Sequence, residues 1–148
     1  MKININSLDE TKNLAVKIAA TVDVGDVICL EGDLGSGKTT FSQFFIKSLI
    51  GSDNEVLSPT FNLVHPYDLP DKIIYHFDLY RLKSAAEAEE IGLYDALDSG
   101  VSIIEWPQII NDILPDDRLL ITLIHDNGNR IANIETFGNW NGRIERIL

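Results

Sequence analysis

The chain has 148 residues, 45% of them hydrophobic, and carries a net charge of −11 at pH 7 from 23 acidic and 12 basic residues. This length and composition predict one folded domain over residues 1–148, and no apolar run approaches the roughly 18 residues of a membrane span, so we expect a cytoplasmic protein without membrane contact. The acidic excess would repel phosphate backbones, which argues against unaided binding of DNA or RNA.

The chain begins with a predicted helix followed by a predicted strand. Residues 7–22 repeat apolar side chains at helical spacing, and Ser7 or Asp9 can cap the first turn. Residues 24–32 form a short apolar run bounded by glycines, which is typical of a buried strand. Cys29 lies in this run as a small core residue. As the only cysteine of the sequence, it excludes an internal disulfide and a cysteine-based metal site.

A second helix and a second strand follow. Residues 39–51 carry phenylalanine and leucine side chains along one stripe, and Gly51 ends the predicted helix. Residues 56–67 mix turn residues with a strand-like stretch. Residues 72–82 predict a buried strand whose polar end is Asp78.

The middle of the chain predicts another helix and a third buried strand. Ser84 precedes Glu87 by three residues, the spacing of a capping box, at the start of an alanine- and glutamate-rich helix over residues 84–97. Residues 100–110 begin with an apolar strand that stops at Glu105. This strand therefore ends on a carboxylate, as the previous one does.

The last part of the chain predicts antiparallel strands, because alternating apolar residues from Arg118 onward surround turn signals at residues 126–129 and 137–142. Strands alternate with helices before this β-rich C-terminal part. The order predicts an α/β three-layer sandwich with a mixed central sheet. In such sheets ligands bind beyond the carboxyl ends of the strands.

The segment between the first strand and the second helix has the pattern of a phosphate-binding loop. Residues 32–39, GDLGSGKT, match glycine, four residues, glycine, lysine, and serine or threonine. Glycines let the backbone N–H groups point inward, and the following helix adds its positive end, so that donors hold a polyphosphate. A glycine-rich turn with an exposed lysine is the alternative, which the strand before the loop and the helix after it disfavour.

The pattern assigns chemistry to the end of the loop. Lys38 would reach the β- and γ-phosphates, and the Thr39 hydroxyl would ligate Mg²⁺. The fold is therefore predicted to be P-loop NTPase-like. The expected nucleotide-binding residues of the loop are Asp33, Gly35, Ser36, Gly37, Lys38, Thr39 and Thr40.

Magnesium also needs oxygen ligands from an acid. Glu31, Asp78 and Glu105 each end a predicted strand, so all three should meet the loop. Asp78 and Glu105 are the candidates for the Mg²⁺ ligand and for the water-orienting base, and the residues alone do not separate these roles. The sequence has no Asn-Lys-x-Asp segment of the kind that guanine-specific proteins use, which favours ATP. Trp106 either stacks on the base or fills the core.

Four segments in this order, GDLGSGKTT, SPTFNLVHPY, HFDLYRL and IIEWP, closely resemble the bacterial TsaE (YjeE) family from about Thr11 to Pro115. That family is the small ATPase of tRNA threonylcarbamoyladenosine synthesis. The resemblance implies a Mg²⁺-dependent ATP hydrolase that works with the TsaD and TsaB proteins and contacts tRNA only through them. Its ATP binding or hydrolysis supports turnover of the complex that modifies the adenosine beside the anticodon, and it does not transfer the group itself.

The resemblance also implies roles for single residues. Gly35, Gly37 and Lys38 match the family's loop, and Thr39 and Glu105 match its Mg²⁺ ligands. The family's switch-like segment and its strand-end aspartate also have counterparts here. These counterparts are residues 58–60 and Asp78, which make Thr60, Asp78 and Glu105 the expected catalytic residues.

Thr60 and His76 each keep two explanations, and Arg130 and Thr11 rest on a looser match. Thr60 either senses the γ-phosphate or starts a strand after Pro59. Arg130 and Thr11 are assigned to the edge of the nucleotide, although the tail that contains Arg130 matches the family less closely. His76 is explained equally by a backbone hydrogen bond at a strand end and by a role in the site.

Two other functions are compatible with the loop. A small nucleoside or metabolite kinase uses the same loop for phosphoryl transfer, but the chain has five arginines and no arginine-rich segment to clamp a second phosphorylated substrate. A scaffold that binds ATP without turnover needs the loop but not Thr60, Asp78 and Glu105. Phosphate release to water separates the ATPase from both.

Overall fold

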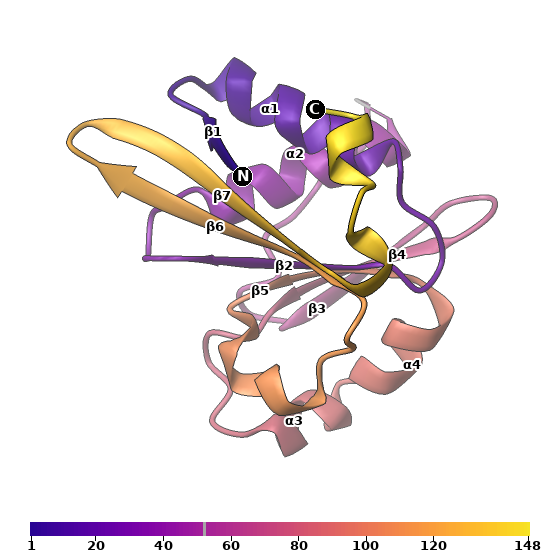
Figure 1. Ribbon diagram of the computed structural model, residues 1–148. Helices are drawn as coiled ribbons and strands as arrows, with labels where there is room; N and C mark the ends of the chain where they lie inside the picture. The colour runs from indigo at the N-terminus through magenta and orange to yellow at the C-terminus, as the bar shows by residue number, and fades with distance from the viewer. Residues whose placement is uncertain (52) are drawn as a thin grey trace.

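The computed structural model in Figure 1 describes residues 1–51 and 53–148. Within these residues the strands form one seven-stranded sheet in the order β1-β7-β6-β2-β5-β4-β3. The strands are β1 (Lys2–Asn4), β2 (Val27–Gly32), β3 (Val64–Asp68), β4 (Ile73–Asp78), β5 (Val101–Glu105), β6 (Arg118–Asp126) and β7 (Asn129–Phe137). The helices are α1 (Leu8–Ala19), α2 (Lys38–Ile50), α3 (Ala85–Glu90) and α4 (Leu93–Ser99), with 3₁₀ helices η1 (Pro107–Ile113), η2 (Gly138–Trp140) and η3 (Ile144–Arg146).

The centre of the sheet is parallel and its margins are antiparallel. β2 lies between β5 and β6 and runs parallel to both, and β4 runs parallel to β5. β3, β7 and β1 are antiparallel to their neighbours. The turn between β6 and β7 places Asn127 and Gly128 at φ angles of 50° and 83°, as a tight hairpin requires. The predicted mixed sheet and antiparallel C-terminal strands are confirmed.

Helices cover both faces of the sheet (Figure 1). α1 and α2 lie on one face, and α3 and α4 lie on the other. Side chains alternate along each strand, so Ile28 and Leu30 of β2 join the apolar cluster under α1 and α2, whereas Val27 and Cys29 join the cluster on the opposite face. The predicted three-layer α/β sandwich is confirmed. The two helix layers pack against the central strands from both faces of the sheet.

The first two helices follow the prediction closely. Ser7, rather than Asp9, caps α1, because its hydroxyl oxygen accepts a hydrogen bond from the Glu10 backbone N–H at 3.1 Å. α2 ends before Gly51, whose φ angle is 100°. Across the described residues, no helix combines the length and apolar character needed to cross a bilayer.

The predicted helix over residues 84–97 is two helices. Gly92 separates α3 from α4 with a φ angle of 89°, a left-handed conformation that ends an α-helix. The predicted capping box is also wrong. Ser84 occupies the N-cap position of α3 without a side-chain cap bond, and the Glu87 carboxylate accepts from the Lys83 backbone N–H instead, at 3.4 Å.

The C-terminal segment is tied to the start of β2. The Arg143 guanidinium donates hydrogen bonds to both carboxylate oxygens of Asp26, at 3.0 and 2.8 Å, and stacks on the Trp140 ring at 3.8 Å. Asp26 and Trp140 are buried, so this contact joins two parts of the chain that are far apart in sequence. That residues 1–148 form a single domain stays a prediction.

Candidate functional site

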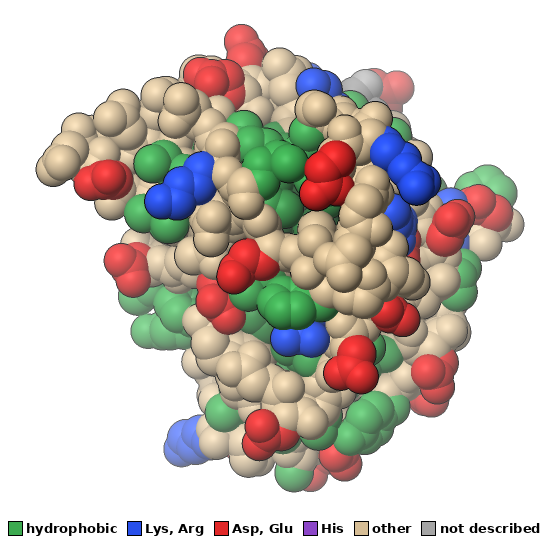
Figure 2. Space-filling view, viewed as in Figure 1, with side chains coloured by type: hydrophobic (Ala, Val, Ile, Leu, Met, Phe, Trp, Pro, Cys, Tyr) green, Lys and Arg blue, Asp and Glu red, His purple; other side chains and the backbone are tan. Residues whose placement is uncertain are grey.

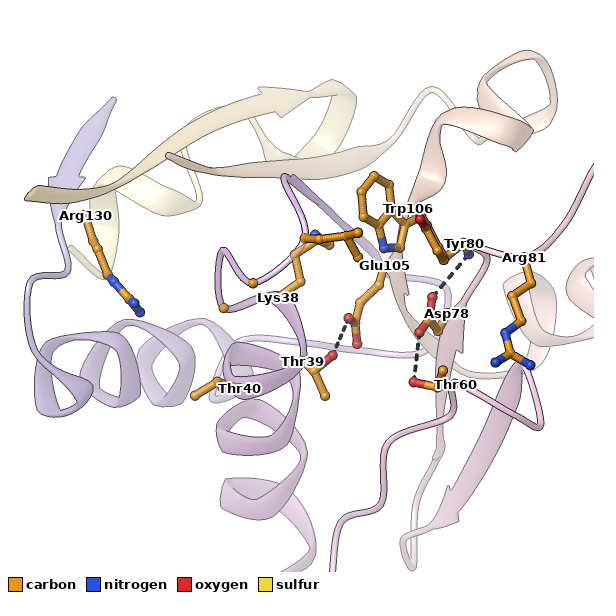
Figure 3. A pocket seen from close by; sticks show the side chains of 13 residues that line it. Lys38, Thr39, Thr40, Thr60, Asp78, Tyr80, Arg81, Glu105, Trp106 and Arg130 are labelled. Carbon is orange, nitrogen blue, oxygen red and sulfur yellow. Dashed lines mark hydrogen bonds between the residues drawn. The ribbon is translucent and has the colours of Figure 1, made fainter. Parts of the chain in front are cut away.

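A cavity of about 550 Å³ lies between the loop after β2 and the ends of β4 and β5. Lys38, Thr39, Asp78 and Glu105 approach one another from the start of α2 and from the two strand ends (Figure 3). The predicted site residues that line the cavity are Gly35, Gly37, Lys38, Thr39, Thr40, Thr60, Asp78, Glu105, Trp106 and Arg130. The fold therefore gathers most of the predicted site into one place.

Other predicted residues lie outside this cavity. Asp33 and Ser36 line a second cavity of about 380 Å³ on the other side of the loop. Thr11 lines a third, of about 340 Å³, which shares Arg130 with the main cavity. The Thr11 hydroxyl donates to a backbone carbonyl one turn earlier in the chain, at 3.2 Å. Arg130 itself lies at the opposite end of the main cavity from Thr60 (Figure 3).

The three strand-end acids do not all reach the cavity. Asp78 and Glu105 are directly opposite each other in the β4–β5 register, and both line it. Glu31 follows Leu30 on β2, so its side chain lies on the other face of the sheet, and it is not among the lining residues. The expectation that Glu31 meets the loop is therefore wrong.

The loop enters α2 through glycines in left-handed conformations. Gly35 and Gly37 have φ angles of 78° and 105°, which side-chain-bearing residues adopt rarely. Gly37 is the N-cap of α2 and supplies no side-chain hydrogen bond to the first turn. The N–H groups at the start of α2 are therefore free of a side-chain cap, and they add to the positive end of the helix dipole.

Lys38 is held over the loop by its backbone. The ammonium Nζ donates to the carbonyl oxygens of Gly32 and Asp33 at 2.6 and 2.9 Å, and it lies 4.0 Å from the Trp106 ring centroid. Burial lowers the pKa of Lys38, and nearby carboxylates, Glu105 most strongly, oppose that shift. The lysine is thus a partly desolvated cation whose nearest hydrogen-bond partners are neutral.

Thr39 and Glu105 form a direct hydrogen bond with each other. The Thr39 hydroxyl donates to Glu105 Oε1 at 2.7 Å, across the gap between α2 and β5. The other carboxylate oxygen, Oε2, lies 2.5 Å from Nε2 of His76, which is fully buried. The hydrogen-bond partner of His76 is therefore a site carboxylate, and its explanation by a backbone hydrogen bond is wrong.

Asp78 organises the other side of the cavity. Its Oδ2 accepts from the Thr60 hydroxyl at 3.3 Å, and its Oδ1 accepts from the Tyr80 backbone N–H at 3.2 Å. β3 begins at Val64, so Thr60 does not start a strand. Ser58 and Thr60 place their hydroxyl oxygens 2.7 Å apart. The segment before β3 is thus attached to the end of β4 through a short chain of hydroxyls.

The cavity rim contains residues that were not assigned to the site from the sequence. Leu34, Tyr80 and Arg81 line the cavity, and the Tyr80 ring lies 4.9 Å from the ring of Trp106. Trp106 has a φ angle of 59° and is half-buried, and it also packs against the apolar cluster under α3 and α4. Its ring is therefore both a core contact and a cavity wall. The motifs GDLGSGKTT and HFDLYRL already contained Leu34, Tyr80 and Arg81.

Comparison with known proteins adds independent information. The family model described as "Threonylcarbamoyl adenosine biosynthesis protein TsaE" matches residues 5–132. The chain belongs to the TsaE family. It is 44% identical over 131 residues to the TsaE protein of Rickettsia bellii, covering 88% of this chain and 91% of the relative. It is 41% identical over 116 residues to TsaE of Bacillus subtilis, covering 78% of this chain and 72% of the relative.

A solved structure agrees with this assignment. The crystal structure of YdiB from Bacillus subtilis superposes with a TM-score of 0.78 at 32% identity, covering 99% of this chain and 90% of that one. The predicted TsaE resemblance and P-loop NTPase-like fold are confirmed. As a TsaE family member, the chain is a component of threonylcarbamoyladenosine biosynthesis in tRNA.

The shape of the loop depends more on Gly32 than on Gly35. A Cβ at Gly32, where φ is 148°, would lie 2.8 Å from the Leu123 carbonyl and 2.5 Å from the Ser36 hydroxyl, whereas a Cβ at Gly35 would meet nothing within 4 Å. We expect Gly32→Ala to lower the free energy of unfolding in urea by about 3 kcal/mol, and Gly35→Ala by about 1 kcal/mol from backbone strain alone. Equal losses would contradict the packing of this loop.

Proposed function

We propose that this TsaE family member binds Mg-ATP in the main cavity and hydrolyses it slowly, in support of a TsaB–TsaD complex that forms threonylcarbamoyladenosine in tRNA. The observation that carries the proposal is the hydrogen bond between Thr39 and Glu105 beside the glycine loop. It joins the hydroxyl that would ligate Mg²⁺ to a buried carboxylate, at the positive end of α2. A turn that only connects β2 to α2 would not require a hydroxyl and a buried carboxylate to be paired beside it.

The loop and Lys38 would hold the polyphosphate. The backbone N–H groups at the start of α2 are free of a side-chain cap, and phosphate oxygens are strong acceptors for such groups. Lys38 donates to neutral carbonyls, so a charged phosphate oxygen would be a stronger partner for its ammonium. The negative charge of a polyphosphate in the loop would also act on Lys38 as the nearby carboxylates do and oppose the lowering of its pKa by burial.

Thr39 and Glu105 would hold the metal. Within the described residues no cluster of three or more histidine, cysteine, aspartate or glutamate side chains is placed to hold a metal ion. Mg²⁺ commonly takes one or two protein oxygens and completes its octahedron with water and substrate phosphates, which suits this donor set. Bound there, the ion would neutralise phosphate charge.

Asp78 and Thr60 would act at the terminal phosphate. Asp78 lies directly across from Glu105, and its oxygens accept from the Tyr80 N–H and the Thr60 hydroxyl. A carboxylate in this place can orient the attacking water. The Thr60 hydroxyl, which now donates to Asp78, can donate to a γ-phosphate oxygen instead. We assign Glu105 to the metal and Asp78 to the water on this geometry.

The nucleoside would extend from the phosphates toward Arg130. Arg130 lies at the end of the main cavity away from Thr60 (Figure 3) and also lines the cavity that contains Thr11. The ring of Trp106 faces Lys38 and Tyr80, so it walls the phosphate end instead of stacking on the base. A preference for ATP over GTP stays a prediction from the missing guanine motif.

Contact with TsaB and TsaD would pass through the cavity rim. Leu34 and Tyr80, which line the cavity, are 68% and 53% exposed. Phe61 is 82% exposed and lies under the guanidinium of Arg81, another lining residue. Exposed apolar side chains of this kind are typical of partner surfaces. Acidic side chains are scattered over the face of the molecule in Figure 2, in keeping with the net charge of −11. A surface of this charge favours contact with protein over direct contact with tRNA.

The geometry supports the ATPase over the two alternatives. Of the arginines in the described residues, Arg81 and Arg130 line the main cavity, while Arg118 and Arg143 stack on aromatic rings elsewhere. Two separated arginines give a kinase little to clamp a second phosphorylated substrate. A scaffold that binds ATP without turnover would not need Asp78, which lines the cavity directly across from Glu105.

Lys38→Ala tests the phosphate assignment. We expect it to weaken ATP binding at least 100-fold, about 2.7 kcal/mol, with the fold retained, because the ammonium faces the loop and not the apolar core. Isothermal titration with ATP measures the loss, and circular dichroism checks the fold. Lys47→Ala, an exposed lysine on the same helix, is the matched control. Wild-type affinity in a folded Lys38→Ala protein would reject the assignment.

Glu105→Gln and Asp78→Asn separate the metal and water roles with little change in volume. We expect Glu105→Gln to raise the Mg²⁺ concentration needed for half-maximal ATP binding about tenfold. Asp78→Asn should leave that concentration within about twofold and slow phosphate release about 100-fold. Asp98→Asn, on the exposed side of α4, is the control. The opposite pattern would show that the two acids are reversed.

A further inference from the structure

The proposed function leaves one buried polar side chain beside the site without a role. His76 is fully buried on β4, two residues before Asp78, in a stretch that is otherwise apolar. Its neighbour across the sheet on β5 is Ile103, and its neighbour on β3 is His65. Neither pairing requires an imidazole, and burying one is costly unless it is hydrogen-bonded.

The contact that His76 makes is with Glu105. Nε2 of the imidazole lies 2.5 Å from Glu105 Oε2, while Thr39 occupies Oε1. We assign Nε2 as the donor, because a carboxylate that ligates Mg²⁺ only accepts hydrogen bonds. In the part of the chain that the structure describes, Nδ1 has no partner. The imidazole is thus bound through one nitrogen only.

Glu105 is therefore clamped from two sides. The Thr39 hydroxyl holds one carboxylate oxygen from α2, and the His76 imidazole holds the other from β4. Glu105 as a whole is 1% exposed, so loss of either partner would leave a buried carboxylate oxygen without its hydrogen bond. With both oxygens held, the carboxylate plane is fixed relative to the loop and the start of α2.

We propose that His76 is a positioning residue that orients the Glu105 carboxylate for Mg²⁺. The inference rests on the proposed function, and it adds a group on β4 that touches neither metal nor nucleotide. Side chains that hydrogen-bond a metal-binding carboxylate fix its orientation, and their loss typically costs 10–100-fold in metal affinity.

Loss of the hydrogen bond between His76 and Glu105 should change the position of the Glu105 carboxylate. A Glu105 carboxylate released from His76 could leave the geometry that it now shares with Thr39, whereas Lys38 keeps its own hydrogen bonds to the loop carbonyls. The defect should therefore appear in the metal requirement, not in the affinity of the loop for phosphate.

Two polar variants of similar size separate positioning from simple packing. The amide nitrogen of His76→Gln lies near the place of Nε2 and can still donate to Glu105, whereas the shorter His76→Asn places its amide near Nδ1. Both lose the aromatic ring, so both should lose stability to a similar extent. His65→Gln and His65→Asn provide the same pair of changes on the adjacent strand, away from Glu105.

The measurement is the binding of a non-hydrolysable ATP analogue, with EDTA and over a Mg²⁺ titration, alongside urea unfolding of each variant. We expect His76→Asn to raise the Mg²⁺ concentration for half-maximal binding at least tenfold while metal-free affinity stays within about twofold. His76→Gln should recover the wild-type requirement to within about threefold. Neither His65 variant should change it.

The outcomes separate this inference from the proposed function. If Glu105→Gln raises the Mg²⁺ requirement and His76→Asn does not, His76 has no positioning role and the metal site stands. Equal effects of His76→Asn and His76→Gln would likewise assign His76 to packing. If Glu105→Gln itself leaves the requirement unchanged, the metal site is wrong and the inference falls with it.

Discussion

The hydrogen bond from Thr39 to Glu105 connects the glycine loop to the central sheet, and the arrangement of the site depends on it. The bond joins the first turn of α2 to the last residue of β5, which lie 66 positions apart in the chain. It brings a hydroxyl and a buried carboxylate to the positive end of a helix, where phosphate is expected. Neither the loop alone nor the strand end alone would place oxygen ligands beside a polyphosphate.

The rest of the fold keeps that bond in place. β2 and β5 are adjacent parallel strands buried by helices on both faces, so their carboxyl ends cannot move independently. The register of β4 against β5 then sets Asp78 opposite Glu105, and His76 holds the second oxygen of that carboxylate. Two acids are thus given different surroundings by one sheet edge, which is how similar side chains acquire different chemical roles.

Much of this was predictable from the sequence. The glycine-lysine-threonine pattern, the apolar runs and the acids that end two of them locate the loop, the strands and most of the cavity, because these features are local or follow from strand polarity. The contact of His76 with Glu105 was not predictable, since it depends on the register of β4 against β5, which sets His76 opposite Ile103 and within reach of Glu105. The break at Gly92 was not predictable from helix propensity, because alanine and glutamate before it and leucine and alanine after it favour helix. Glu31 lies on the face opposite to Leu30 because side chains alternate along β2.

The central claim is that the cavity binds ATP and turns it over as an accessory to a TsaB–TsaD complex. Phosphate release from ATP tests it most directly, measured for the wild-type chain alone and with TsaB, TsaD and tRNA, with Lys38→Ala as the blank. We expect slow release by the chain alone, faster release with the partners, and none above background for Lys38→Ala. Release that equals the blank under both conditions would contradict it.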